Sequence, residues 1–304
     1  DCGMSSFTAS DVPDQSGKTF LVTGANTGIG FEAAMVLAER GGRVLLGCRS
    51  EDRAAEAIER IEAAVEGADL RFIPLDQGDL ASVAAAAELV AEEDRLDVLV
   101  NNAGIMMPPR ELTTDGFESQ FGVNHLGTFA LTCQLLDKLA ETEGARVVVT
   151  SSIAHRGGDI YFDDIDASEK YGAQDRYQQS KLANLLFTYE LERRLRATDS
   201  TTIAVGCHPG IADTELGRHM PKIVMLAAPL LKVFFNSPAE GAWPTLMAAT
   251  SEEMEGGDYV GPSKRGETAG PARKVPSTGR SLDEQLAARL WDLSVEMTGV
   301  DPGL

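Results

Sequence analysis

Residues 18–40 read KTFLVTGANTGIGFEAAMVLAER, a stretch that joins a short apolar run, a glycine-rich turn and a helical pattern. Gly24, Gly28 and Gly30 fall within the turn TGANTGIG. Glycines at such a strand-to-helix turn let the backbone approach a pyrophosphate closely, and the N-terminus of the following helix stabilises its negative charge. The stretch therefore predicts the strand–turn–helix unit of a dinucleotide-binding fold.

The same alternation of short apolar runs and helical patterns continues along the chain. The helical patterns carry apolar residues at three- and four-residue spacing, and strands that are apolar almost throughout are expected when helices cover both faces of a sheet. We therefore predict an α/β chain with one doubly wound parallel sheet of about seven strands, a single-domain Rossmann fold. The apolar runs lie at 18–24, 42–48, 70–76, 96–102, 145–152 and 201–210.

No repeat or low-complexity linker divides the chain. We expect one domain at 18–260, preceded by an extension at 1–17 in which residues 1–3 are a non-native remnant before Met4. Residues 261–304 are expected to form a C-terminal loop and an amphipathic closing helix.

Two segments near the end of the domain allow more than one interpretation. The segment at about 212–237 is expected to form a substrate lid, and residues 220–235 within it are mostly apolar. The same residues are also compatible with packing on the core, a subunit interface or a peripheral membrane patch. The polar stretch 262–280 either covers the site or lies on the surface.

The composition excludes several classes of function. The chain has 304 residues, of which 47 are acidic and 27 basic, so its formal charge is −20. Nucleic acid and anionic membrane surfaces would repel it. The N-terminus lacks a signal-peptide pattern, and the longest apolar run, at 223–231, is far shorter than the ~20 residues that cross a bilayer. We therefore expect a cytoplasmic protein without a transmembrane segment.

The cysteines and histidines predict neither a disulfide framework nor a metal site. No CxxC pair occurs, and no histidine has metal-ligand spacing with neighbouring carboxylates. The residues concerned are Cys2, Cys48, Cys133, Cys207, His125, His155, His208 and His219.

Residues at the ends of later strands favour one form of the cofactor, because ligands bind outside the carboxyl ends of strands in open α/β sheets. An acidic residue after the second strand would repel a 2′-phosphate, whereas this chain has Arg49 there. We therefore favour NADP(H) over NAD(H); the alternative is that Arg49 merely faces solvent. The residues expected to contact the cofactor are Gly24, Asn26, Thr27, Gly28, Ile29, Gly30, Arg49, Asp76, Gln77, Asn102, Ala103, Gly104, Thr150, Tyr177, Lys181, Pro209, Gly210, Ile211 and Thr214.

Tyr177 and Lys181 stand one helical turn apart in RYQQSKLANLLFTYELERRL. Side chains four apart on a helix share one face. A free tyrosine has a pKa of about 10, and a positive charge beside the phenol would lower it by favouring the phenolate. The pair is therefore a candidate acid/base device.

Several ordered motifs resemble those of the short-chain dehydrogenases/reductases over about residues 18–260. They are TGANTGIG, NNAG, Asn124 in GVNHLGTFALT, Ser152 in VVVTSSIAH, YQQSK and HPG. The form TGxxxGxG is that of the carbonyl and alcohol oxidoreductases of the family. The chain is most similar to the retinol dehydrogenase and WW-domain oxidoreductase group and its bacterial relatives.

The resemblance implies a catalytic set of Asn124, Ser152, Tyr177 and Lys181. Tyr177 would be the general acid or base, and Ser152, chosen over the adjacent Ser151, would hydrogen-bond the substrate oxygen. Lys181 would bind the nicotinamide ribose hydroxyls. Asn124 would support a water molecule that links Lys181 to bulk solvent.

We accordingly expect an NADP(H)-dependent oxidoreductase that interconverts a carbonyl and an alcohol on an apolar small molecule. Two alternatives remain: a reductase of C=C bonds, as the related protochlorophyllide reductases are, and a non-catalytic NADP(H)-binding sensor or scaffold. Members of the family are commonly dimers or tetramers, so the resemblance implies a homodimer or homotetramer.

Overall fold

The computed structural model describes residues 6–211 and 236–304. In this part of the chain eight strands form one sheet in the order β3-β2-β1-β4-β5-β6-β7-β8. All neighbours run parallel except β7 and β8, which are antiparallel. The strands are β1 (Thr19–Thr23), β2 (Arg43–Cys48), β3 (Leu70–Pro74), β4 (Val98–Asn101), β5 (Arg146–Thr150), β6 (Ile203–Cys207), β7 (Tyr259–Lys264) and β8 (Ala269–Lys274).

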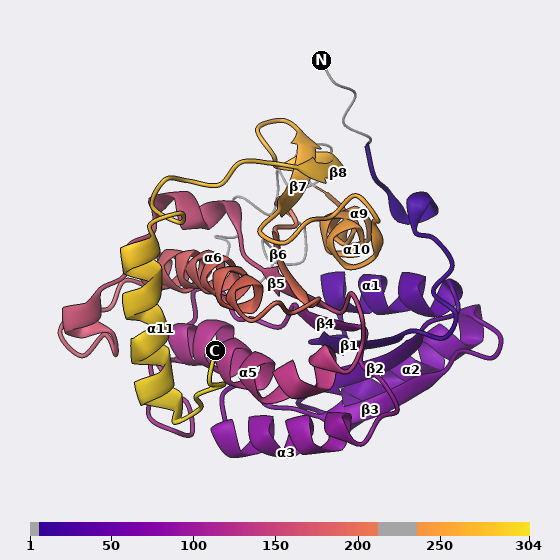
Figure 1. The fold of residues 1–304 in the computed structure, drawn as a ribbon, viewed down its shortest axis with the longest axis horizontal. Coiled ribbons are helices and arrows are strands. Elements are labelled where there is room, and N and C mark those ends of the chain that lie inside the picture. Colours follow the sequence, from indigo (N-terminus) through magenta and orange to yellow (C-terminus); the bar gives the residue numbers. More distant parts are fainter. Residues whose placement is uncertain (1–5, 212–235) are drawn as a thin grey trace.

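Helices cover both faces of this sheet (Figure 1). One layer contains α1 (Gly28–Glu39), α2 (Glu51–Ala64), α9 (Pro238–Gly241) and α10 (Trp243–Thr250). The opposite layer contains α3 (Leu80–Ala91), α5 (Gly127–Ala140) and α6 (Ala173–Ala197), and α11 (Glu284–Thr298) packs on α6. The direction of strand order reverses between β1 and β4, which creates the switch point where such sheets bind ligands.

The short helical segments lie between these elements. They are η1 (Ala9–Asp11), α4 (Ser119–Phe121), the π-helical η2 (Gly122–Leu126), η3 (Ile153–Gly157) and η4 (Phe162–Asp164). Within residues 6–211 and 236–304, none of the helices combines the length and hydrophobicity that a membrane span needs.

Successive residues of the central strands are buried on opposite faces of the sheet. Phe20 and Val22 belong to the core cluster under α1, α2 and α10, whereas Leu21 belongs to the cluster under α3, α5 and α6. All three side chains are fully buried. Burial on both faces explains why the strand runs are apolar throughout and do not alternate.

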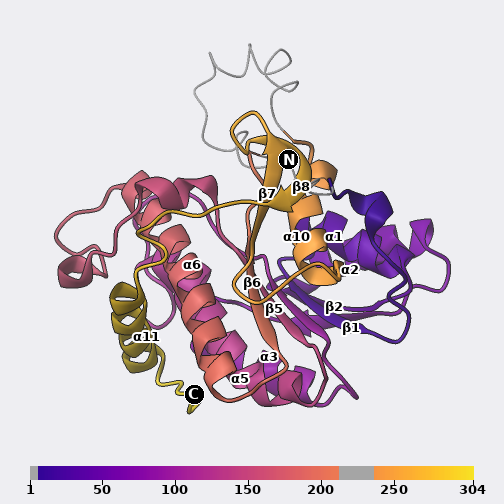
Figure 2. The same ribbon diagram turned by 45° about the horizontal axis from the view of Figure 1, so that its top comes forward.

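The predicted single-domain α/β fold with a doubly wound sheet is confirmed, and two details differ. The sheet has eight strands where about seven were expected, and its last strand is antiparallel, so the sheet is not wholly parallel. Part of the polar stretch 262–280 forms the β7–β8 hairpin, which Figure 2 shows at the upper edge of the sheet. The proposed lid at about 212–237 lies almost wholly outside the described residues, as does Thr214.

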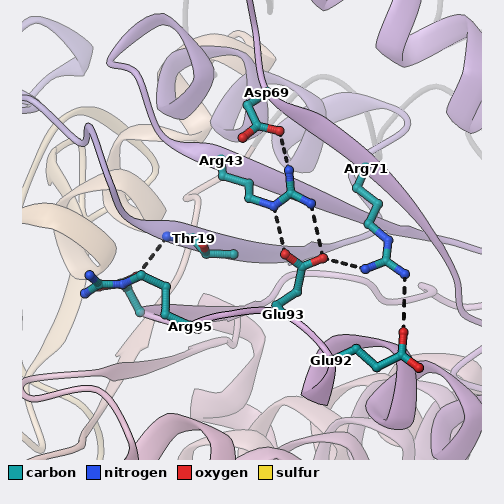
Figure 3. A network of polar contacts seen from close by, with 8 residues as sticks. Thr19, Arg43, Asp69, Arg71, Glu92, Glu93 and Arg95 are labelled. Carbon is teal, nitrogen blue, oxygen red and sulfur yellow. Dashed lines mark hydrogen bonds and ion pairs between the residues drawn. The ribbon is translucent and has the colours of Figure 1, made fainter.

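An ionic network ties strands β2 and β3 to the end of α3 at the opposite edge of the sheet (Figure 3). The Glu93 carboxylate accepts from Arg43 Nε at 2.8 Å and from Arg71 Nη1 at 2.5 Å. Arg43 also pairs with Asp69, and Arg71 Nη2 lies 4.0 Å from Glu92. Opposite charges thus alternate across this edge and fix the position of the α3 C-terminus.

Candidate active site

The glycine turn joins β1 to α1 at the carboxyl edge of the sheet. Gly24 (φ 68°) and Gly28 (φ 59°) adopt left-handed backbone conformations. A Cβ at Gly30 would lie only 2.4 Å from the Gly24 carbonyl oxygen, so only glycine allows this close packing. Thr27, the N-cap of α1, makes no side-chain cap hydrogen bond. The N–H groups at the start of α1 therefore lack a side-chain cap from Thr27, and this geometry fits a pyrophosphate.

The NNAG turn after β4 is fastened to this glycine turn. Asn102 Nδ2 donates to the carbonyl oxygen of Thr23 at 2.9 Å. The backbone N–H groups of Asn102 and Ala103 both donate to Thr23 Oγ1, at 3.0 and 2.9 Å. Gly104 follows, and a Cβ there would lie 3.1 Å from Asn124 Oδ1. The turn thus brings small backbone beside the catalytic candidates.

The ends of β2 and β3 place Arg49 beside Asp76. Arg49 Nη1 lies 4.0 Å from Asp76 Oδ2, and the Arg49 side chain is 77% exposed. Gln77 is buried instead, and its Nε2 donates to Thr128 Oγ1 on α5 at 3.2 Å. A cofactor contact from Gln77 would therefore have to come from its backbone.

Tyr177 and Lys181 on α6 line one cleft with Ser152 and Pro209. Lys181 Nζ lies 5.7 Å from the centroid of the Tyr177 ring and donates to the Thr150 carbonyl oxygen at 3.3 Å. The tyrosine and lysine both remain largely buried. The full lining of the cleft is Ile29, Asn102, Gly104, Ile105, Thr150, Ser151, Ser152, Tyr177, Lys181 and Pro209.

The two adjacent serines have different partners. Ser151 is buried, and its Oγ donates to the carbonyl oxygen of Lys181 at 2.7 Å. Ser152 is the N-cap of η3, and its Oγ accepts from the N–H of Ala154 at 3.2 Å. That bond uses an acceptor position of the Ser152 hydroxyl and not its hydrogen, which is the group a substrate oxygen requires.

Asn124 lies in the π-helical segment η2, a form of helix that often marks functional positions. Its Nδ2 donates to the carbonyl oxygen of Ile105 and to Ser180 Oγ, both at 2.9 Å. Its Oδ1 accepts from the N–H of Ile105 at 2.7 Å. Both amide hydrogens are therefore used within the protein, so any water held by Asn124 would be bound through an oxygen.

The HPG turn after β6 is held by residues distant in the sequence. Asn236 Nδ2 donates to the carbonyl oxygen of Pro209 at 3.1 Å, and the N–H of Ile211 donates to the carbonyl oxygen of Thr268 at 3.0 Å. Gly210 has a φ of 78°, and a Cβ there would lie 2.5 Å from the Thr268 oxygen. The turn is thus shaped by the β7–β8 hairpin.

The sequence alone did not indicate two supporting residues of this site. Thr23 accepts two backbone bonds from the NNAG turn, and the first letter of TGANTGIG was the available signal. Asn236 is buried and has no motif around it, so its position beside Pro209 becomes visible only in the folded chain.

A glycine turn on β1, a cleft at the switch point and a tyrosine–lysine pair on α6 define a nucleotide-binding oxidoreductase. The model of the family described as short chain dehydrogenase matches residues 18–222. The chain belongs to this family. It is therefore an oxidoreductase of the CH–OH/C=O type.

Relatives of this chain include human enzymes. Retinol dehydrogenase 14 of Homo sapiens is 43% identical over 304 residues, covering 93% of this chain and 87% of its own. Retinol dehydrogenase 13 of Homo sapiens is 41% identical, covering 94% and 86%.

A solved structure described as a putative uncharacterized protein from Mycobacterium Paratuberculosis has a TM-score of 0.82 and 38% identity, covering 99% of this chain and all of that one. These similarities confirm the predicted place within the retinol dehydrogenase-like group.

Proposed function

We propose that the chain is an NADP(H)-dependent enzyme that interconverts an apolar aldehyde or ketone and its alcohol, with Tyr177 as the acid/base group. The observation that carries the proposal is the cleft itself. It joins Tyr177, Lys181 and Ser152 to Ile29 and Asn102 of the two turns that would hold the cofactor. A protein that only binds nucleotide has no need of a serine and a tyrosine together in that cleft.

Each residue has a distinct task in this proposal. Tyr177 gives a proton to the carbonyl oxygen in reduction and takes it back in oxidation. Ser152 donates a hydrogen bond to the same oxygen as charge develops on it. The ammonium of Lys181 stabilises a phenolate at Tyr177 and binds the ribose hydroxyls. The nicotinamide, when bound, supplies or accepts the hydride.

The apolar substrate is supported by the relatives. Retinol, named in the human proteins 41–43% identical to this chain, is an apolar alcohol. The segment at 220–235 is also mostly apolar in sequence. The NADP(H) preference rests on Arg49, whose exposed guanidinium stands at the end of β2 where a 2′-phosphate would bind.

Replacement of Tyr177 with Phe tests the mechanism. NADPH oxidation is first screened against aldehydes and ketones from short aliphatic to retinoid size, with product analysis for an alcohol. In Tyr177→Phe we expect kcat to fall by about 10²-fold or more, because the proton donor is lost, while NADPH still binds.

Tyr189→Phe is the matched control, since Tyr189 lies three turns further along α6 and bonds Ser277 outside the cleft. A kcat in Tyr177→Phe equal to that of the parental protein would refute the assigned role. A product in which a C=C bond has been reduced would favour the C=C reductase alternative.

A further inference from the structure

The turn of the β7–β8 hairpin, residues 265–268, lies against the active site although it is far from it in sequence. Arg265, Gly266 and Glu267 have φ values of 54°, 66° and 69°. Residues other than glycine rarely adopt this left-handed conformation, and those that do gather at functional sites. The turn also supplies the carbonyl oxygen of Thr268 that holds Ile211.

Glu267 bonds two segments that meet at the cleft. Its Oε2 accepts from Arg156 Nη2 at 2.6 Å and lies 3.2 Å from His208 Nε2. Arg156 belongs to η3, which Ser152 caps, and His208 is the first residue of the HPG turn. The Glu267 side chain is only 13% exposed, and that of His208 is fully buried. One carboxylate therefore links the segment that Ser152 caps to the HPG turn.

The contacts of His208 define which of its nitrogens carries the proton. The N–H of Gly210 donates to His208 Nδ1 at 3.2 Å, so Nδ1 must be the unprotonated nitrogen. Burial lowers the pKa of His208, which keeps the ring neutral at pH 7. The proton is then on Nε2 and is donated to Glu267. Glu267 thus stabilises the Nε2–H tautomer of His208. In that tautomer Nδ1 accepts from the N–H of Gly210 and so shapes the HPG turn.

The buried His208 ring packs against strand β7. A Cβ at Gly261 on β7 would lie 2.1 Å from His208 Nε2, so the ring packs directly on the backbone of this strand. The Tyr259 ring covers it at a centroid distance of 5.3 Å. Tyr259 also contacts the His155 ring, at a centroid distance of 5.6 Å.

His155 completes the connection to the serine. Its Nδ1 lies 2.6 Å from the carbonyl oxygen of Ser152, and because a carbonyl can only accept, Nδ1–H is the donor. The Ser152 backbone is therefore held by a buried ring that contacts the ring beside His208.

We propose that Glu267 is a positioning residue that aligns the Ser152 segment and the HPG turn by holding Arg156 and the His208 tautomer together. This inference rests on the role proposed above for Ser152 and on the cofactor contacts expected of Pro209 and Gly210 in the HPG turn. Glu267 touches neither reacting group and acts through Arg156 and His208.

The test compares Glu267→Ala with the parental protein by two measurements. In protein labelled with ¹⁵N-histidine, NMR without cofactor is expected to show an Nε2–H tautomer for His208 that is lost in Glu267→Ala. Glu267→Gln is expected to rescue the tautomer, because its amide oxygen still accepts. In turnover we expect kcat to fall about tenfold and KM to change by less than about threefold, since alignment and not binding is lost.

Lys274→Ala is the matched control, because it removes the ion pair with Asp258 at the other end of the same hairpin. It should leave tautomer and kcat unchanged. If Glu267→Ala does not fold, Arg156→Ala replaces it, since Arg156 is exposed and its loss should lower kcat in the same direction.

The proposal would be overturned if Glu267→Ala left both the tautomer and kcat unchanged. It would also be overturned if Arg156→Ala left kcat unchanged. A fall in kcat that matches the unfolded fraction, measured by thermal melting, would also overturn it. Tyr177→Phe is assayed in parallel. If it loses activity while Glu267→Ala keeps it, only the positioning role fails; if Tyr177→Phe keeps activity, the proposed mechanism fails.

Discussion

Arg49 is the residue on which the proposed choice between the two nicotinamide cofactors depends. Its guanidinium is mostly exposed, and its nearest carboxylate oxygen, on Asp76, is 4.0 Å away. A pair at this distance on the surface contributes little stability. The guanidinium therefore loses little by turning toward a phosphate, which it can bind with two parallel hydrogen bonds.

Arg49→Ala is expected to weaken NADPH binding about tenfold, which corresponds to about 1.4 kcal/mol, and to leave NADH binding unchanged. The difference arises because NADH has no 2′-phosphate. Fluorescence titration of both cofactors measures it. Arg53→Ala, which removes an exposed arginine in the first turn of α2, is the control. Equal losses for NADPH and NADH, or none for either, would contradict the assignment.

Residues in local patterns could be predicted from the sequence, whereas residues joined only by the fold could not. Tyr177 and Lys181 are four positions apart on one helix, and both line the cleft. Glu267 and His208 are 59 positions apart, and no spacing rule connects them. Gln77 followed a strand end as expected, yet its side chain is buried toward α5 because the chain enters α3 there.

At the scale of elements, the ionic network anchors α3 to the edge of the sheet away from the cleft (Figure 3). The Glu93 side chain is 6% exposed, whereas Glu92 beside it is 70% exposed. When this buried carboxylate is neutralised, each of its two arginine partners loses its buried counter-charge and keeps only an exposed one, Asp69 or Glu92.

Glu93→Gln is therefore expected to lower the free energy of unfolding by about 2 kcal/mol, without changing kcat. Urea denaturation measures the stability. Glu92→Gln makes the same substitution at the exposed neighbour and should lower the free energy of unfolding by less than about 0.5 kcal/mol. Equal effects of the two substitutions would show that burial of Glu93 does not decide its contribution.

The sequence did not predict β8, which lacks an apolar period, or the π-helical form of η2, which an apolar period cannot distinguish from an ordinary helix. Strand β8 reads AGPARK and lies at the edge of the sheet, where few side chains need to be buried. The π-helical turn around Asn124 has the same apolar residues as an ordinary helix. The central strands, buried on both faces, were predicted because burial requires their apolar runs.

At the scale of the whole molecule, three histidines are buried within residues 6–211 and 236–304 of a chain of net charge −20. Burial lowers the pKa of His125 to about 3 and that of His155 to about 4, and it lowers the pKa of His208 as well. In the unfolded chain these rings titrate at about 6.5. Above that pH they are neutral in both states and do not make stability depend on pH.

Below pH 6.5 the unfolded chain binds protons that the folded chain excludes, so stability falls as the pH decreases toward 4, by up to about 1.4 kcal/mol per pH unit for each such histidine. His125→Phe isolates one of these contributions. The ring lies among Phe121, Phe129 and Phe187, so a phenyl group suits the site. The free energy of unfolding is measured by urea denaturation at pH 7.0, 6.0 and 5.0. Its decrease with falling pH should be smaller in the variant, by the contribution of about one histidine. An unchanged slope would mean that His125 takes up its proton equally in both states.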